Sequence, residues 1–196
     1  MTTEITERQF EIIEAAGKLL TEKGVGGLTI KNIALEMGFS ESAVYRHFKS
    51  KEDIIIAMLD YLAESINIRF DNICKSDIPP EKKIVEVFQS QLDFFEANPN
   101  FVVAVFSDGL FEESGKINDA IQKIMSANMI NVIPVIALGQ KMGKFNSAMK
   151  PEELMHIVMG SFRLQMYKWR ISNMAFDIQK EGKKVINNLM KLITKQ

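Results

Sequence analysis

The 196-residue sequence contains a single cysteine, Cys74, and no excess of basic residues. One thiol cannot form an intramolecular disulfide, so we expect a chain that folds in a reducing compartment. The 24 lysines and arginines are balanced by 25 aspartates and glutamates, which leaves a formal net charge of −1. This balance excludes a generally basic nucleic-acid coat, and any DNA binding must come from a local patch.

Long apolar runs and a leader-like N-terminus are also missing. Met1 to Arg8 is polar, and the apolar runs elsewhere are short and interrupted by polar residues. We therefore expect a cytoplasmic protein with no signal peptide and no membrane span.

Motifs of enzymes and metal sites are equally scarce. The two histidines and Cys74 lie far apart without zinc-ligand spacing, and the chain has neither a P-loop nor a G-x-S-x-G sequence. The adjacent carboxylates Glu112-Glu113 and Glu152-Glu153 are typical of helix ends. We expect no enzyme activity, no metal and no cofactor.

Helical periodicity is what the sequence has in abundance, and 46% of its residues are hydrophobic. The pattern predicts an all-α fold of about nine helices, two of them short and capped by Thr29 and Ser40. The longer helices are expected at about 6–23, 51–74, 81–97, 101–111, 116–142, 151–174 and from 177 almost to the C-terminus.

The segment from Leu28 to Lys51, LTIKNIALEMGFSESAVYRHFKSK, has the pattern of a helix-turn-helix. Ala34 is small enough for two helices to cross closely, and Gly38 suits a turn with positive φ. Val44 lies at the spacing that turns it toward the core. Five other apolar residues complete the expected core of the motif: Ile30, Ile33, Met37, Phe39 and Phe48.

The residues LTIKNIALEMGFSESAVYRHFKSKEDI resemble the tetracycline-repressor (TetR/AcrR) family. The resemblance includes the Gly38-Phe39-Ser40 turn and the Lys49-to-Lys51 entry into the next helix, and it is strong over about residues 5–60. It implies a three-helix DNA-binding domain at residues 1–50 and a helical ligand-binding and dimerisation domain at 51–196. It also implies a homodimer on a palindromic double-stranded DNA operator, with one recognition helix per half-site.

Five polar side chains of the motif are candidates for contacts to the DNA backbone, which position a protein without specifying sequence. Tyr45 and His47 can reach phosphates, and Lys49 and Lys51 sit where the fourth helix begins. Thr29 can use its hydroxyl or the N-terminus of the second helix. The alternative for His47 is a solvated surface residue.

Base edges are the expected partners of Ser42, Ala43 and Arg46. Arg46 can read guanine, but it can equally bind a phosphate or remain a solvated charge. Ser40 faces outward beside them, and Lys31 is either a DNA contact or an ordinary exposed lysine.

The C-terminal region is dense in aromatic residues and methionines, which suit a loosely specific apolar pocket. In the family that the sequence resembles, this region encloses an effector. The alternative for each residue is plain core. The candidate ligand-binding residues are Phe88, Gln91, Phe95, Phe106, Met125, Asn128, Met129, Phe162 and Met166.

The helix expected at 151–174 carries apolar residues on two sides, which indicates burial nearly all round, and the last helix carries apolar residues with lysines elsewhere. Pairing across a two-fold axis would give a four-helix interface, as the resemblance implies; the alternative is packing inside one subunit. The candidate interface residues are Phe162, Trp169, Val185, Ile186, Leu189, Met190 and Ile193.

The sequence therefore predicts a homodimeric transcriptional repressor that an unknown small apolar or amphipathic effector releases from DNA. Two alternatives stay open. One is a DNA-binding factor of the same fold without an inducer, and the other is an activator.

Overall fold

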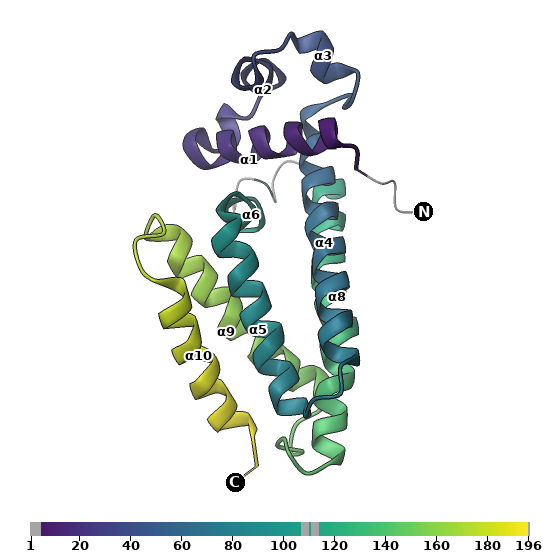
Figure 1. Cartoon of the computed structure of the whole chain (residues 1–196), viewed down its shortest axis with the longest axis vertical. Coiled ribbons are helices and arrows are strands. Elements are labelled where there is room, and N and C mark those ends of the chain that lie inside the picture. Colours follow the sequence, from purple (N-terminus) through teal and green to yellow (C-terminus); the bar gives the residue numbers. More distant parts are fainter. Residues whose placement is uncertain (1–4, 107–109, 111–113, 196) are drawn as a thin grey trace. The chain divides into compact units, whose positions relative to one another are not determined.

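The structure, a computed structural model, describes residues 5–106, 110 and 114–195. Among these residues it contains nine helices and no strand, which confirms the all-α prediction (Figure 1). The helices are α1 (Glu7–Gly27), α2 (Ile30–Met37), α3 (Glu41–Tyr45), α4 (Lys51–Lys75), α5 (Pro80–Ala97), α6 (Pro99–Val105), α8 (Gly115–Lys141), α9 (Pro151–Ile171) and α10 (Ile178–Ile193).

Several helix ends differ from the sequence prediction; α1, for example, reaches Gly27 rather than residue 23. α6 ends at Val105, whereas the periodicity predicted a helix to Phe111, which lies outside the described residues. α3 ends at Tyr45, and a turn follows over Arg46 and His47. The recognition helix is therefore only five residues long, and several candidate DNA contacts lie just beyond it.

The chain forms two compact units. One comprises Met1–Ala63 and Pro99–Ile124, and the other comprises Glu64–Asn98 and Met125–Gln196. The division falls inside α4 and α8, so each of these helices contributes residues to both units. The boundary at residue 50 concerns function rather than packing, and it stays a prediction.

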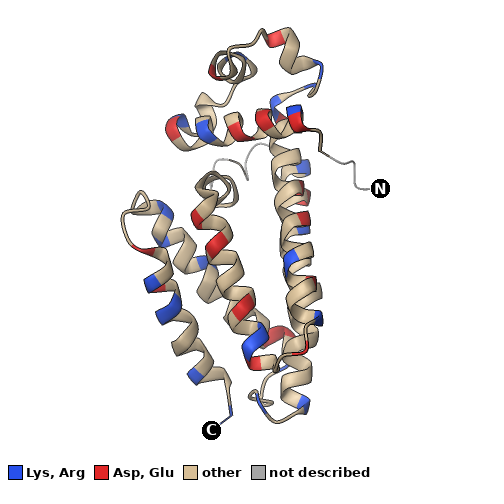
Figure 2. Ribbon diagram, viewed as in Figure 1, with Lys and Arg blue, Asp and Glu red and all other residues tan. Residues whose placement is uncertain are grey.

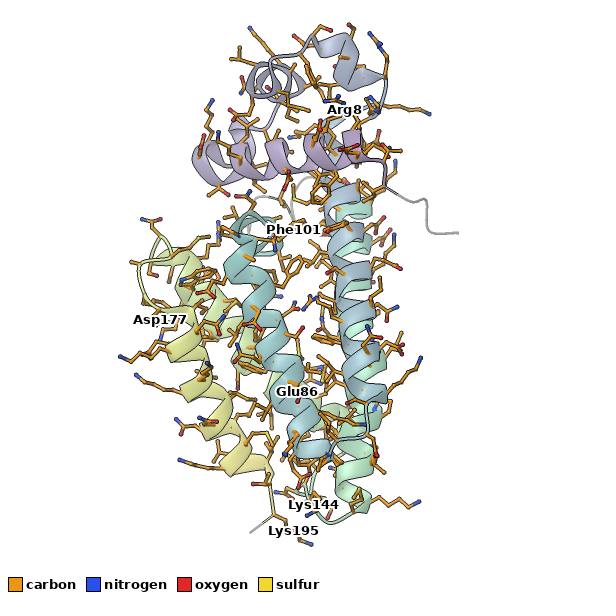
Figure 3. All side chains as sticks on the ribbon, viewed as in Figure 1. Arg8, Glu86, Phe101, Lys144, Asp177 and Lys195 are labelled. Atoms are coloured by element: carbon orange, nitrogen blue, oxygen red, sulfur yellow. The ribbon has the colours of Figure 1, made fainter. Side chains whose placement is uncertain are left out.

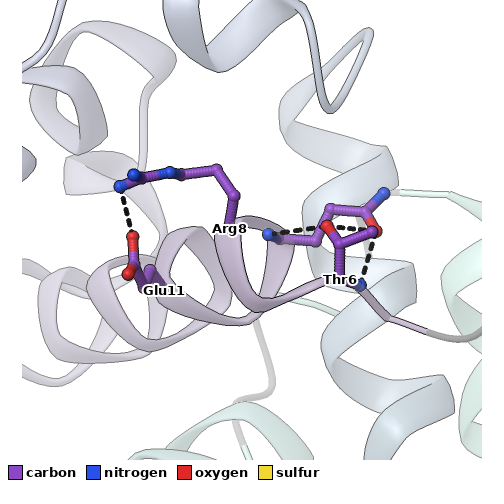
Figure 4. Close-up of polar contacts among 4 residues, drawn as sticks. Thr6, Arg8 and Glu11 are labelled. Atoms are coloured by element: carbon purple, nitrogen blue, oxygen red, sulfur yellow. Dashed lines mark hydrogen bonds and ion pairs between the residues drawn. The ribbon is translucent and has the colours of Figure 1, made fainter.

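In the first unit, α1 begins with a capping box and packs against α6. Thr6 Oγ1 accepts from the Gln9 backbone N–H at 3.3 Å, and Gln9 Oε1 accepts from the Thr6 backbone N–H at 3.0 Å (Figure 4). A Cβ on Gly17 would lie 2.8 Å from Asn100 Cβ, so only glycine allows α6 its close approach to α1. Thr21 Oγ1 donates to Asn100 Oδ1 at 3.0 Å across the same contact.

An aromatic cluster joins α1, α4 and α6 within this unit. The Tyr61 ring lies 5.2 Å from that of Phe10 and 5.7 Å from that of Phe101, between ring centroids. Figure 3 labels Phe101. Ring pairs at these distances add to the stability that burial provides.

In the second unit, α10 packs closely against α5 and the C-terminal segment against the loop after α8. A Cβ on Gly182 would lie 2.5 Å from Leu92 Cδ1. The Asn146 N–H donates to the Ile193 carbonyl at 2.8 Å, and the Lys195 N–H donates to the Lys144 carbonyl at 3.0 Å. Figure 3 labels Lys144 and Lys195 at this junction.

By length and composition alone, α8 is the one helix of the described part of the chain that could cross a membrane. A core helix passes the same test, and 44% of the most apolar window of α8 is buried. The helix also carries the buried amide of Asn131, which donates to Asn67 Oδ1 at 2.9 Å and to the Ala127 carbonyl at 2.8 Å. The composition of α8 is therefore weak evidence for a membrane span.

Candidate DNA-binding surface and effector cavity

The turn between α2 and α3 depends on Gly38, which has φ 68° and ψ 30° in the left-handed region. No atom lies within 4 Å of a Cβ built there, so the requirement for glycine comes from backbone conformation alone. The Phe39 N–H then donates to the Ala34 carbonyl at 2.8 Å and closes the turn. This is the geometry that the sequence predicted for the motif.

The core of the motif is largely as predicted. Ile33 and Val44 are fully buried, Ala34 is 2% exposed, and Ile30 and Phe48 are also buried. Phe39 corrects the prediction, because 39% of it is exposed and it does not join this core. Its ring instead lies 4.9 Å below the Arg8 guanidinium of α1.

Arg8 also forms an ion pair with Glu11 one turn along α1 (Figure 4). A carboxylate on one side and an aromatic face on the other hold the guanidinium at the turn. Arg8 is a residue that the sequence analysis missed, since no local pattern links it to a ring 31 positions later.

The start of α3 is capped by Ser40, whose Oγ accepts from the Ala43 N–H at 3.3 Å. Its hydroxyl also lies 2.9 Å from Ser42 Oγ. Ser40 therefore stabilises the recognition helix, and a DNA contact would compete with that cap. Thr29 caps α2 in the same way, accepting from the Asn32 N–H at 3.1 Å, and its own hydroxyl proton remains available to a phosphate.

The other candidate DNA contacts face solvent. Tyr45 is 51% exposed, and Ala43 and Lys51 are half-buried. None of the ten candidates is buried, and six of them lie at the cap of α3, in α3 or in the turn after it. The exposed candidates are Thr29, Lys31, Ser40, Ser42, Tyr45, Arg46, His47 and Lys49.

Charge on this surface is local, as the composition required. Figure 2 shows acidic residues at the start of α3 and basic residues after its end. Lys18 of α1 forms a short ion pair with Glu36 of α2. The hydrogen bond and charge of Glu36, aided by Glu22, raise the pKa of Lys18. This pair neutralises one of the carboxylates close to the motif.

A small cavity lies in the core of the second unit, lined by residues of α4, α5, α8 and α9. Its volume is about 10 Å³, which is room for one water molecule at most. The Phe88 and Phe162 rings meet edge to face across it, with centroids 4.9 Å apart. The lining residues are Phe70, Ile84, Val87, Phe88, Gln91, Val132, Val158, Met159 and Phe162.

The candidate ligand-binding residues separate into three groups. Phe88, Gln91 and Phe162 line the cavity, and buried Phe95 stacks beside it, its ring 6.2 Å from that of Phe162. Five others do not line it. Phe106 is buried in the other unit, Asn128 and Met166 are buried elsewhere in the core, Met129 is half-buried, and Met125 is 52% exposed.

Sequence analysis missed six lining residues: Phe70, Ile84, Val87, Val132, Val158 and Met159. The i, i+3, i+7 spacing of Ile84, Val87 and Gln91 marks one face of α5 and was a usable signal for part of the set.

One charged side chain meets the cavity from outside. Arg69 Nη2 donates to Gln91 Oε1 at 2.7 Å, and Arg69 Nη1 donates to the Ser90 carbonyl at 2.8 Å and to Ser90 Oγ at 2.9 Å. The guanidinium also lies 4.6 Å from the centre of the Phe94 ring. Arg69, Ser90 and Phe94 line an open groove of about 550 Å³ on α4 and α5.

The candidate dimer residues differ in burial, and their place in an interface stays a prediction. Five of them are buried within this chain: Phe162, Trp169, Ile186, Leu189 and Ile193. Val185 and Met190 are half-buried. The apolar side chains that remain on the surface of these two helices lie on other faces, and Ile157, Leu164 and Ile171 are 43%, 60% and 61% exposed, with Leu192 at 76%.

No group of three or more histidine, cysteine, aspartate or glutamate side chains that could hold a metal occurs among the described residues. Cys74 is half-buried, and burial raises the pKa of its thiol. His156 is exposed, and its Nδ1 lies 2.7 Å from the Glu152 carbonyl.

Comparison with known proteins agrees with this geometry. Residues 12–58 match the family described as "Bacterial regulatory proteins, tetR family". The chain is 28% identical over 123 residues to the HTH-type transcriptional regulator YerO of Bacillus subtilis, covering 61% of this chain and 42% of YerO. It is 29% identical over 118 residues to the nucleoid occlusion factor SlmA of Vibrio cholerae, covering 60% of each. The matched part thus spans less than two thirds of either relative.

Among solved structures, the transcriptional regulator FadR of Bacillus subtilis in complex with stearoyl-CoA has the same fold. The TM-score is 0.81 at 18% identity, covering 92% of this chain and 97% of FadR. The matched segment, residues 12–58, contains the whole helix-turn-helix that the structure describes. Residues 12–58 thus form a helix-turn-helix domain of the tetR family of bacterial regulatory proteins, and the chain as a whole has the fold of FadR.

Proposed function

We propose that this regulator is a cytoplasmic homodimeric repressor that a small apolar or amphipathic effector releases from a palindromic operator. The observation that carries the proposal is the presence of two separate features in one chain. An exposed helix-turn-helix supplies DNA contacts, and an apolar core supplies a cavity with a single polar lining residue, Gln91.

α4 is the element through which an effector would act. It begins at Lys51, directly after the recognition segment, and its residue Phe70 lines the cavity. An effector that displaces Phe70 would act on the helix that begins at Lys51. The shift in DNA affinity equals the difference in effector affinity between the DNA-binding and released states, typically about 1–3 kcal/mol.

Selection of binding sites from random duplex DNA tests the operator. We expect a palindrome whose half-sites lie one helical turn apart or a multiple of it. A single half-site of equal affinity would contradict a dimeric arrangement. Fluorescence anisotropy on the selected site then measures release by candidate effectors.

The dimer that we propose uses the exposed apolar stripe of α9. Ile157, Leu164 and Ile171 recur every seven residues, so they lie on nearly the same face, and Leu192 of α10 is also exposed. Such a face on a soluble helix is typical of an interface. Leu164→Glu should give a monomer by light scattering, whereas Leu138→Glu, at an exposed position of α8, should leave the dimer intact.

A thermal-shift screen of the purified protein tests for an effector. Acyl-CoAs lead the library because FadR, a fold relative, was solved with stearoyl-CoA; fatty acids, bile acids and cationic dyes complete it. A ligand at ~100 times its Kd stabilises the folded state by about 2.7 kcal/mol, which moves the melting temperature visibly. A hit must also lower operator affinity to support the proposal.

A second candidate is a DNA-binding factor of the same fold that needs no inducer. The cavity volume of about 10 Å³ favours it, and the similarity to SlmA, a nucleoid occlusion factor, is consistent with it. Its signature is operator binding without a thermal shift from any library member. An activator would instead raise transcription in a reconstituted assay when bound at the selected site.

A further inference from the structure

The N-terminal end of the recognition helix has little support from the core. In a helix-turn-helix, the residues at this end are the ones that contact base edges. Residues 40–43 are exposed or half-buried, and the one buried side chain of α3 is Val44, near the other end of the helix. The Ser40 cap is a bond to Ala43 of the same helix, so it does not tie this end to the rest of the unit. The position of the base-reading end therefore depends on the turn that precedes it.

Phe39 is the residue of that turn that meets another helix. It directly precedes Ser40, and its backbone N–H donates to the Ala34 carbonyl at 2.8 Å. Its ring lies under the Arg8 guanidinium of α1, with 4.9 Å between the guanidinium carbon and the ring centre. A cation over an aromatic ring is attracted to it, so this contact links the turn to α1.

The place of Arg8 on α1 explains why an arginine reaches the turn. Arg8 lies on the same helical face as Ile12 and Leu19, which are both 1% exposed, and it extends that buried face by one turn at its N-terminal end. An arginine there can pack its apolar stem and keep its charge in solvent.

A second contact restrains the Arg8 side chain. Its Nη1 donates to the Glu11 carboxylate one turn further along α1 (Figure 4). The contact with the Phe39 ring needs no N–H donor, so the two contacts do not compete. Arg8 is therefore anchored to its own helix while it holds the turn.

We propose that Arg8 is a positioning residue for base recognition, and that it acts through the Phe39 ring on the turn that sets the N-terminal end of α3. α1 then supports the reading of DNA without touching the duplex. This inference rests on the operator binding that we propose above.

Hydrogen exchange of the Phe39 amide tests the contact in the free protein, because this N–H is released when the turn opens. Arg8→Met keeps an unbranched apolar side chain and removes the cation. It should lower the protection factor of this amide by about two- to fivefold, the effect of one exposed cation–π contact. The Phe48 amide, which donates to the Val44 carbonyl at 3.1 Å, should keep its protection. An equal loss at both amides would indicate general destabilisation and would overturn the inference.

A double-mutant cycle shows whether Arg8 acts through the ring. Phe39→Leu should lower the protection at position 39 as much as Arg8→Met does, and the double variant should lose no more than either single variant. Arg8→Lys and Phe39→Trp retain a cation over a ring and should keep the wild-type protection. Lys23→Met, which removes a charge from an exposed position of the same helix, should also keep it. Independent, additive losses would overturn the inference.

Fluorescence anisotropy measures the consequence for DNA. The ratio of affinity for the selected operator to affinity for random duplex should fall about two- to fivefold in Arg8→Met, with an unchanged salt dependence, and it should not fall in Lys23→Met. A direct phosphate contact from Arg8 would instead weaken binding to all sequences alike and reduce the salt dependence by about one ion. That result would also overturn the inference.

The two measurements separate this inference from the proposed function. Operator binding with an unchanged affinity ratio in Arg8→Met would sustain the proposed function and refute the role of Arg8 in base recognition. A wild-type protein that selects no duplex would refute both the proposed function and that role, and the exchange experiment would still show whether Arg8 holds the turn.

Discussion

The surface around α3 and the apolar cavity of the second unit differ in their exposure to solvent. Tyr45 and its neighbours after α3 are exposed, and the backbone geometry of Gly38 and the Ser40 cap set their positions. Around the cavity, side chains such as Phe162, 4% exposed, are held by one another. A turn and a helix cap, both local in sequence, can therefore position side chains for DNA contact. The cavity instead depends on packing between residues of four helices.

The largest expected effect is loss of packing at the cavity. Phe162→Ala removes the edge-to-face partner of Phe88 and should lower the free energy of unfolding by about 3–5 kcal/mol. Urea denaturation measures this change. Tyr167→Ala, at an exposed aromatic of the same helix, should cost much less. Equal losses would mean that the two sites do not differ in packing.

At the recognition surface, the expected loss is in DNA affinity rather than in stability. Arg46→Met should cost about 1–3 kcal/mol of binding and relax preference at one base position if Arg46 reads a base edge. Lys49→Met should weaken binding to all sequences alike and reduce the salt dependence. Anisotropy titrations across salt concentrations and single-base operator variants separate the two roles. Identical profiles would refute the assignment.

The next effect comes from the backbone conformation of the turn between α2 and α3. Gly38→Ala should destabilise the protein by about 1–2 kcal/mol, because a residue with a Cβ is unfavourable at φ 68° although no atom obstructs it. Gly26→Ala, at a helical glycine with equally open surroundings and no positive φ, should be neutral or stabilising. Thermal melts of the two variants provide the comparison, and a destabilised Gly26→Ala would point to sterics instead.

The smallest effect is expected from the ion pair of Lys18 with Glu36, because Lys18 is exposed. Glu36 raises the pKa of Lys18 above the ordinary value of 10.5. The pair therefore stabilises the folded state fully below pH 10.5, and its contribution disappears as the pH rises through the raised value. Melting temperatures of wild type and Lys18→Met should converge in that range. A constant difference would exclude the pair as its source.

The difference between the two regions also explains what the sequence could predict. Thr29, Gly38 and Ser40 act through hydrogen bonds to residues at most four positions away. A short segment of sequence is therefore enough to predict their roles. Phe39 was misassigned because its partner, Arg8, comes from another helix. Local spacing identifies an apolar residue but not the surface that it meets.

The same limit applies to the core of the second unit. Met125 and Gln91 both belong to helices with strong periodicity, yet one is 52% exposed and the other lines the cavity. In α10 the apolar face of Ile186 and Leu189 was evident, but whether it meets its own subunit or a partner was not. These assignments depend on how helices pack, which no single helix determines.

The close packing of α6 against α1 at Gly17 has a consequence for synthesis of the protein. The unit that contains the helix-turn-helix also needs residues 99–124, so the DNA-binding segment cannot complete its packing when residue 63 has left the ribosome. At about 5–20 residues per second, the remaining 61 residues to position 124 take about 3–12 s. Until residues 99–105 of α6 have been made, the nascent α1 lacks this partner, and a fragment truncated near residue 63 would lack it permanently.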